Sequence, residues 1–229
     1  KITTENTIYY YADSLNNPWG NKTKSQLLSI LKIIASWFKE MNIDIVICGC
    51  NTTYSLFKDE LPAIFGCPVL NLISEPENYS HSSYSILATE NTIESNIFKQ
   101  TILSVNQNCQ IQEIACPGLA HAIETNQSKE MLKLFDQYIQ QTIHHTIILG
   151  CTHYPLVIDT LQLVYPQKLF IDPSTLFIKN LNFPNIVSEN PTIIFNISGD
   201  KTKFIDRIDK YLSTSHYTIY DCPKKTTLA

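Results

Sequence analysis

The chain has 229 residues and a formal net charge of −4, with 44% hydrophobic and 17% charged residues. These values are typical of a globular protein with room for one large domain or two small ones. No basic run and no Lys/Arg patch with interleaved aromatic residues occurs, which argues against nucleic acid as a partner. No apolar stretch approaches the roughly 20 residues that a membrane span requires.

The N-terminal residues and the cysteines indicate the compartment. Residues 1–7 lack the apolar segment of a secretory signal, so we expect a cytoplasmic protein. The seven cysteines are then expected to be reduced thiols and not a disulfide framework. A zinc site is disfavoured, because the Cys-x-Cys of Cys48 and Cys50 has no second close pair of ligands. We therefore predict no metal.

The first half of the chain alternates strands and helices. A β-branched and aromatic run predicts a strand at 7–11, and loop residues follow at 12–20. Thr23 is suited as the N-cap of an amphipathic helix that ends at about residue 41. The next predicted elements are a strand at 43–49, a helix at 53–61 and a strand at 68–73. The polar segment 77–83 predicts a domain boundary.

The second half repeats the alternation. Its predicted elements are strands at 84–88, 111–116, 146–150, 168–171, 192–196 and 217–220, and helices at 92–105, 117–124, 128–143, 155–164, 173–180 and 200–212. Such alternation predicts parallel sheets covered by helices on both faces. We therefore predict an α/β fold of two similar parallel-sheet units with the active site in the cleft between them. One unit comprises residues 1–80 and 157–229, and the other comprises residues 81–156.

Two predicted strand ends carry the same arrangement of residues. Segment 45–54, IVICGCNTTY, and segment 147–155, IILGCTHYP, each place Gly-Cys and a polar pair directly after an apolar run. Ligands of open parallel sheets bind beyond the carboxyl ends of the strands. Cys50 and Cys151 are therefore expected to face one another across a shared site. The alternative, two small buried packing cysteines, is weakened by the match between the two segments.

Two thiols on opposite sides of one carbon atom can act as a base and an acid. Removing a proton from one face and returning one to the other inverts a stereocentre without any cofactor. A thiolate is favoured at a helix N-terminus by the backbone amides and the helix dipole. The polar side chains beside the thiols are suited to holding a carboxylate and an ammonium group, and they are Asn51, Thr52, Thr152 and His153.

These residues resemble the glutamate racemases of the aspartate/glutamate racemase superfamily. Segment 150–156, GCTHYPL, matches a family signature, and Cys50-Asn51-Thr52 matches the core of another. The loop at 12–22 is similar to the family's substrate loop, with Trp19 where a tyrosine is usual. Further similar segments are 88–95, 115–117 and 171–172. The resemblance therefore covers nearly the whole chain.

The resemblance implies roles for particular residues. Cys50 and Cys151 would transfer the protons, and His153 and Glu124 would assist Cys151. Contacts with the amino acid would come from Trp19, Gly20, Asn51, Thr52, Thr89, Thr92, Thr152 and His153. Without the resemblance, Thr89, Thr92 and Glu124 would be interpreted as an N-cap, a helix residue and a solvated charge.

The implied activity is cofactor-independent racemisation of L- and D-glutamate. Its product D-glutamate would serve peptidoglycan synthesis, and thereby cell wall biogenesis and cell shape. The expected partner is a small amino acid, and a homodimer is left open. Two alternatives remain. One is a relative acting on aspartate or another small acid, because Trp19 could reshape the pocket. The other is a degenerate racemase-like binding protein without turnover.

The chain departs from the family ahead of the strand at 7–11. Family members begin with a strand, an Asp-Ser-Gly-x-Gly-Gly turn and a helix, and this unit is absent here. In the family the turn supplies an acidic residue that assists the first cysteine. The strand belongs inside the first sheet, so we expect a gap and exposed strand edges there. Two explanations remain open: the sequence lacks the start of the natural chain, or the protein is a naturally shortened relative with impaired or altered chemistry.

Overall fold

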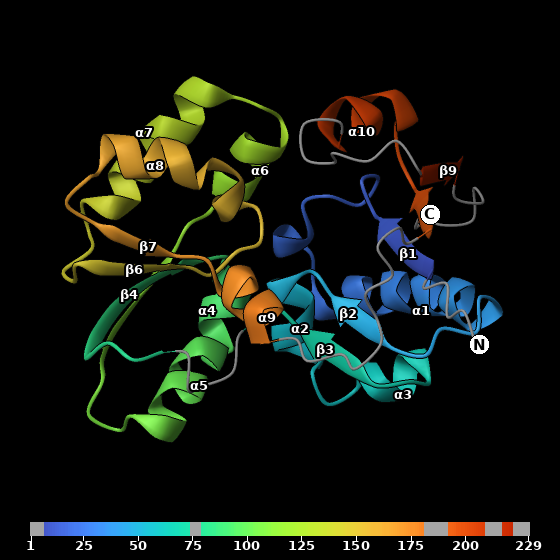
Figure 1. Ribbon diagram of the computed structural model, residues 1–229, viewed down its shortest axis with the longest axis horizontal. Coiled ribbons are helices and arrows are strands. Elements are labelled where there is room, and N and C mark those ends of the chain that lie inside the picture. The colour runs from blue at the N-terminus through green and yellow to red at the C-terminus, as the bar shows by residue number, and fades with distance from the viewer. Residues whose placement is uncertain (1–6, 74–78, 181–191, 209–216, 222–229) are drawn as a thin grey trace, which may run out of the picture.

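The computed structural model describes residues 7–73, 79–180, 192–208 and 217–221 (Figure 1). The first part of the chain forms β1 (Thr7–Ala12), α1 (Lys24–Glu40), β2 (Val46–Cys48), α2 (Asn51–Phe57), α3 (Leu61–Phe65) and β3 (Val69–Asn71). A short 3-10 helix at Trp19–Asn21 precedes α1. Within the described ranges, no helix combines the length and the apolar character that crossing a membrane requires.

The middle of the chain forms β4 (Ser83–Ala88), α4 (Glu90–Glu94), α5 (Ile97–Val105), β5 (Gln110–Ala115), α6 (Leu119–Glu124), α7 (Ser128–Ile139) and β6 (Thr146–Leu149). After a 3-10 helix at Tyr154–Val157 come α8 (Ile158–Val164), β7 (Leu169–Ile171) and α9 (Pro173–Asn180). The last described elements are β8 (Thr192–Ile197), α10 (Lys201–Ile208) and β9 (Tyr217–Asp221). All strand pairs among them are parallel.

The second unit is a four-stranded sheet in the order β5-β4-β6-β7. Leu87 and Ile147 point to one face, where α6, α7 and α8 cover them. Ile86 and Ile148 point to the other face, where α5 covers them. Figure 1 shows α7 and α8 on one side of these strands and α4 and α5 on the other. The α/β fold with sheets covered on both faces is confirmed, because both faces of β4 and β6 are apolar and must be buried.

The second unit extends further along the chain than the expected boundary at residue 156. Strand β7 pairs with β6, with Thr146 opposite Leu169. Leu161 of α8 and Phe170 of β7 pack in the same core as β6. The boundary therefore lies after β7. Helix α8 follows Cys151 and returns the chain to the same sheet. There β7 pairs with the edge of β6 that β4 does not occupy.

The first unit contains two separate pieces of sheet, β1-β8-β9 and β2-β3. Strands β1 and β2 are not paired with each other, so the sheet is interrupted between them. Helix α1 begins after the predicted N-cap Thr23, whose side chain accepts from the backbone N–H of Gln26 in a capping box. Its buried Leu27 and Leu31 pack with Val46 of β2. The helix therefore anchors the β2 piece of the sheet.

Candidate active site

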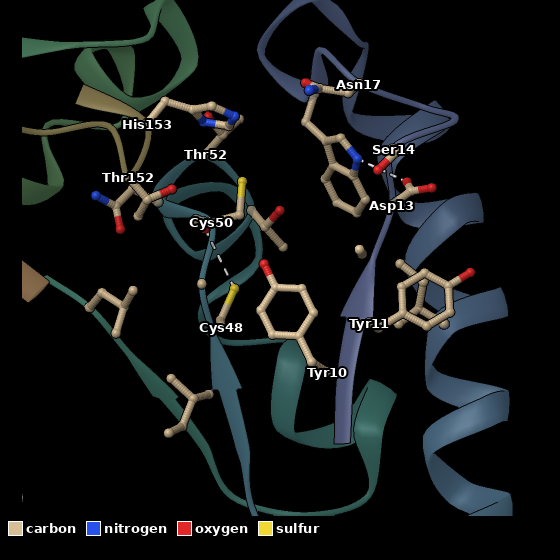
Figure 2. A pocket seen from close by; sticks show the side chains of 18 of the residues that line it. Tyr10, Tyr11, Asp13, Ser14, Asn17, Cys48, Cys50, Thr52, Thr152 and His153 are labelled. Atoms are coloured by element: carbon tan, nitrogen blue, oxygen red, sulfur yellow. Dashed lines mark hydrogen bonds between the residues drawn. The ribbon is translucent and has the colours of Figure 1, made fainter. Parts of the chain in front are cut away.

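The two thiols lie at equivalent places in the two units. Gly49 and Cys50 directly follow β2, and Gly150 and Cys151 directly follow β6. Cys50 is the N-cap residue of α2, which begins two residues earlier than the sequence predicted. Both cysteines line one cavity of about 1440 Å³. Figure 2 shows Cys50 and His153 at the same end of this cavity. Cys50 and Cys151 therefore line the same cavity, and their role in it stays a prediction.

Asn51 joins the two cysteine segments. Its side chain is buried, at 4% exposure, and its Nδ2 donates to the carbonyl oxygen of Gly150 at 2.9 Å. The two residues are 99 positions apart and belong to different units. The Oδ1 of Asn51 is buried without a hydrogen-bond partner in the described part of the chain. An unsatisfied buried acceptor is costly, so this oxygen is suited to accept from a bound ammonium group.

A row of threonine hydroxyls extends from the cavity into the second unit. The Oγ1 atoms of Thr52 and Thr89 lie 2.9 Å apart, and those of Thr89 and Thr92 also lie 2.9 Å apart. Thr52, Thr89 and Thr152 line the cavity, whereas Thr92 is 1% exposed and lies behind Thr89. Thr92 is therefore placed to orient Thr89, and the structure does not bring it to the cavity wall. Gly20 lies beside Thr89, because a Cβ placed on Gly20 would lie 3.5 Å from the Thr89 side chain.

Cys151, His153 and Glu124 form a hydrogen-bonded chain. Nδ1 of His153 lies 4.0 Å from Sγ of Cys151, and its Nε2 lies 3.0 Å from Oε2 of Glu124. Burial lowers the pKa of His153, but the hydrogen bonds and negative charges of Cys151 and Glu124 outweigh it and raise the pKa to about 10. His153 is therefore an imidazolium near neutral pH, held between a carboxylate and the sulfur.

The raised pKa of His153 makes the fold's stability depend on pH. Because the pKa is about 10 in the folded chain and 6.5 without these partners, the stabilisation is complete below about pH 6.5 and is lost as the pH rises through about 10. We expect the difference in unfolding free energy between the wild type and His153→Gln to shrink steadily from about pH 6.5 to about pH 10. Urea unfolding at several pH values measures it. A difference that is constant over this window would contradict the paired imidazolium, and exposed His121→Gln on α6 is the control.

Two further thiols lie beside the site but are held neutral. Burial, followed by the charge of Cys50, raises the pKa of Cys48 to about 12. Burial, followed by the charge of Cys151, also raises the pKa of Cys116. Sγ of Cys48 donates to the carbonyl oxygen of Cys50 at 3.5 Å. Cys48 and Cys116 therefore lie beside Cys50 and Cys151 as neutral thiols, because burial disfavours the thiolate of each.

Asp13 positions the aromatic ring of Trp19 and was not singled out by the sequence analysis. Its Oδ2 accepts from Nε1 of Trp19 at 2.9 Å, and its Oδ1 accepts from Asn16 at 2.9 Å and from Ser198 at 2.7 Å. Asp13 stands in the loop that resembles the family's substrate loop, which is the signal that could have found it. Nothing in the sequence links Ser198 to this loop, because the contact spans 185 positions.

Tyr10 is a second residue that the sequence analysis missed. It lines the cavity from β1, and Figure 2 shows it between β1 and the segment bearing Cys48 and Cys50. Tyr10 keeps 51% of its surface exposed within the open cavity, and the partial loss of solvent there, followed by the charges of Glu124 and Cys50, raises its pKa. The phenol therefore stays protonated and can only donate towards negative groups. Alternation along the strand could have indicated that Tyr10 points away from Tyr9 and Tyr11.

Comparisons with known proteins agree on one family. The model of the Asp/Glu/Hydantoin racemase family matches residues 11–181. A glutamate racemase of Prochlorococcus marinus is 31% identical over 228 residues, covering 90% of this chain and 86% of its own length. One of Fusobacterium nucleatum is 29% identical and covers 94% of this chain and 87% of its own length.

Solved structures show the same fold. Glutamate racemase from Francisella tularensis, solved in complex with D-glutamate, superimposes with a TM-score of 0.82 at 21% identity. The match covers 97% of this chain and 90% of that one. Glutamate racemase isoform RacE1 from Bacillus anthracis superimposes with a TM-score of 0.81 at 19% identity, over 96% and 89% of the two chains. With the family match along 11–181, these findings show that the chain belongs to the Asp/Glu/Hydantoin racemase family and is an amino-acid racemase-type isomerase.

Proposed function

We propose that this protein racemises glutamate without a cofactor, by proton transfer between Cys50 and Cys151. The observation that carries the proposal is that two thiols, each directly after an equivalent strand of its unit, line one cavity. The Asn51–Gly150 hydrogen bond supports it, because it ties the two cysteine segments together across the units. A reaction that needs one group on each face of a carbon atom requires such a fixed relation.

In the proposed reaction one thiolate removes the proton from Cα, and the electron pair remains on the carbon and its carboxylate. The thiol on the other face then gives its proton to Cα, so the product is the mirror image and no atom is gained or lost. Cys151 exchanges its proton with Nδ1 of His153. Glu124 holds the other ring nitrogen and so orients the imidazole.

The cavity wall supports recognition of an acidic amino acid by neutral donors and one cation. Among the described residues that line it, none is lysine or arginine. Carboxylate oxygens of the substrate would accept from the hydroxyls of Thr52 and Thr152 and from the His153 imidazolium. The free Oδ1 of Asn51 would accept from the ammonium group. Trp19, held by Asp13, would close one side of the pocket.

The relatives support glutamate as the substrate. The proteins of Prochlorococcus marinus and Fusobacterium nucleatum are glutamate racemases, and the Francisella tularensis enzyme was solved with D-glutamate. We propose that the product D-glutamate supplies peptidoglycan synthesis in the cytoplasm. Six cysteines of the described chain are free, as a reducing compartment requires.

Solvent deuterium tests the proposal. In deuterium oxide, L-glutamate incubated with the protein is expected to lose its optical rotation and to gain deuterium at Cα in the product, because thiol protons exchange with solvent. Circular dichroism follows the first change and proton NMR the second. Added pyridoxal phosphate or chelator is expected to leave the rate unchanged. Products that keep protium at Cα would contradict proton transfer through the two thiols.

The same measurement separates the alternatives. Trp19 stands at the cavity where the family has a tyrosine, and its larger ring favours a shorter substrate, so aspartate is assayed in parallel. Faster racemisation of aspartate than of glutamate would make aspartate the substrate. Binding of either amino acid without loss of rotation or of the Cα signal would instead identify a binding protein without turnover.

A further inference from the structure

The loop that carries Trp19 begins beside the end of another strand. Asp13 directly follows β1, and Ser198 directly follows β8. The two strands pair in parallel, with Ala12 opposite Ile197, so their carboxyl ends lie side by side. The backbone N–H of Ser198 continues this ladder by donating to the carbonyl oxygen of Ala12 at 3.0 Å. The start of the loop and Ser198 are therefore held in a fixed register.

The hydroxyl of Ser198 makes both of its hydrogen bonds to this loop. Its Oγ donates to Oδ1 of Asp13 at 2.7 Å and accepts from the backbone N–H of Leu15 at 3.1 Å. The next residue is a glycine, and a Cβ on Gly199 would lie only 2.8 Å from Cβ of Ser14. The loop therefore packs closely against the turn after β8, which fixes both its backbone and the side chain of Asp13.

Asp13 connects Ser198 to the indole of Trp19. Oδ1 of the carboxylate accepts from Ser198 and from Asn16, and Oδ2 accepts from Nε1 of Trp19 at 2.9 Å. Both oxygens belong to one planar group, so the contacts at Oδ1 set the direction in which Oδ2 meets the indole. The indole N–H is the only polar group of a tryptophan side chain. The orientation of the Trp19 ring therefore depends on the Ser198 hydroxyl.

The backbone next to Trp19 is held from the second unit. Nδ2 of Asn91, on α4, donates to the carbonyl oxygen of Gly20 at 3.1 Å. Asp13 and Trp19 both line the cavity that contains the thiols. Figure 2 shows Asp13 on the side of this cavity away from Cys50. Trp19 is thus a cavity wall that is fixed at both ends, and a fixed wall can select substrates by their length.

We propose that Ser198 is a positioning residue that sets the substrate selectivity of the site, by holding Asp13 and, through it, Trp19. Ser198 is not among the described residues that line the cavity, so it acts without touching the substrate. This inference rests on the proposed function, because selectivity is measured with glutamate and aspartate. These substrates differ by one methylene, which a pocket distinguishes by about 10–200-fold. Such a distinction requires a wall that does not yield.

Ser198→Ala is expected to raise the KM for glutamate about tenfold and to leave kcat within about twofold of the wild type. The lost hydrogen bond ends on a carboxylate, and bonds to charged groups are the stronger ones. The thiols stay in place, so the chemical step is retained. The values of kcat/KM for glutamate and aspartate are expected to move closer together, because a loosened wall accepts both lengths.

Two variants serve as controls for this result. Ser198→Thr keeps the hydroxyl and is expected to restore the wild-type KM. Ser104→Ala, on α5, removes an exposed hydroxyl that donates to a carbonyl oxygen within its own helix, and it is expected to leave KM and kcat unchanged.

The indole N–H of Trp19 reports the contact without turnover. The chain has two tryptophans, and Trp37→Phe assigns their indole signals in a nitrogen-15 spectrum. In the wild type, the Trp19 N–H is expected to exchange with solvent at least about tenfold more slowly than a free indole. Ser198→Ala is expected to remove most of this protection and to leave the Trp37 signal unchanged. A wild type without racemisation would refute the proposed function, and this exchange would still show whether Ser198 holds Trp19.

A double-mutant cycle tests whether Ser198 acts through Trp19. Trp19→Phe removes the indole donor, so adding Ser198→Ala to it is expected to change KM by less than about twofold. Three results would overturn the proposal. One is a wild-type Trp19 indole that exchanges as fast as a free indole. Another is a Ser198→Ala variant with unchanged indole exchange or with an unchanged KM. The third is an equal rise in KM from Ser198→Ala with and without the indole.

Discussion

Cys50→Ser and Cys151→Ser are each expected to reduce racemisation of glutamate by at least about a hundredfold, in both directions. A proton removed from one face of Cα must be returned to the other, so either loss stops the full reaction. Serine keeps nearly the same volume, but its hydroxyl is a much weaker acid than a thiol and cannot supply the anionic base. The rate of change in circular dichroism, started from L-glutamate and separately from D-glutamate, measures both directions.

Cys67→Ser is the matched control for this result. Cys67 is partly buried and does not line the cavity. We expect this variant to keep the wild-type rate, and all three variants to keep the wild-type far-ultraviolet spectrum. If Cys50→Ser or Cys151→Ser retained more than about a tenth of the rate, that thiol would not be the acid or base of the reaction.

Gly150→Ala is expected to destabilise the fold by about 1–3 kcal/mol, the usual cost of overpacking a close contact. The added methyl would lie 3.0 Å from the Leu87 carbonyl oxygen and 3.1 Å from the ring of Phe98. The Leu87 oxygen belongs to the backbone of β4, so it cannot move away without disturbing the sheet. The change would also disturb the 2.7 Å hydrogen bond from the Gly150 N–H to Leu87. Urea unfolding measures the loss.

Gly49→Ala is the comparison within the same chain. The same methyl group meets nothing within 4 Å there, so we expect a change in unfolding free energy of less than about 0.5 kcal/mol. Equal losses at Gly49 and Gly150 would show that the two strand ends have the same surroundings.

The sequence by itself predicted the α/β fold and placed Cys50 and Cys151 at equivalent strand ends. Apolar runs, Gly-Cys pairs and N-caps such as Thr23 are local features, and local patterns suffice to position them. The resemblance added His153 through segment 150–156 and Glu124 through segment 115–117, which it follows, and the structure places these two side chains 3.0 Å apart. These predictions depend on residues near one another in the chain or on a motif already known.

Only the tertiary structure decided the features that depend on distant contacts. The Asn51–Gly150 bond and the Asp13–Ser198 bond join residues 99 and 185 positions apart, and no local pattern encodes them. Thr92 carries the same hydroxyl as Thr89 but lies behind it, because helix packing sets which one faces the cavity. Burial lowers the pKa of His153, and the raised value arises because two partners, Cys151 and Glu124, outweigh that effect. These surroundings do not exist in an extended chain. The break between β1 and β2 is likewise decided by strand pairing, because each strand's own sequence is compatible with a neighbour on either edge.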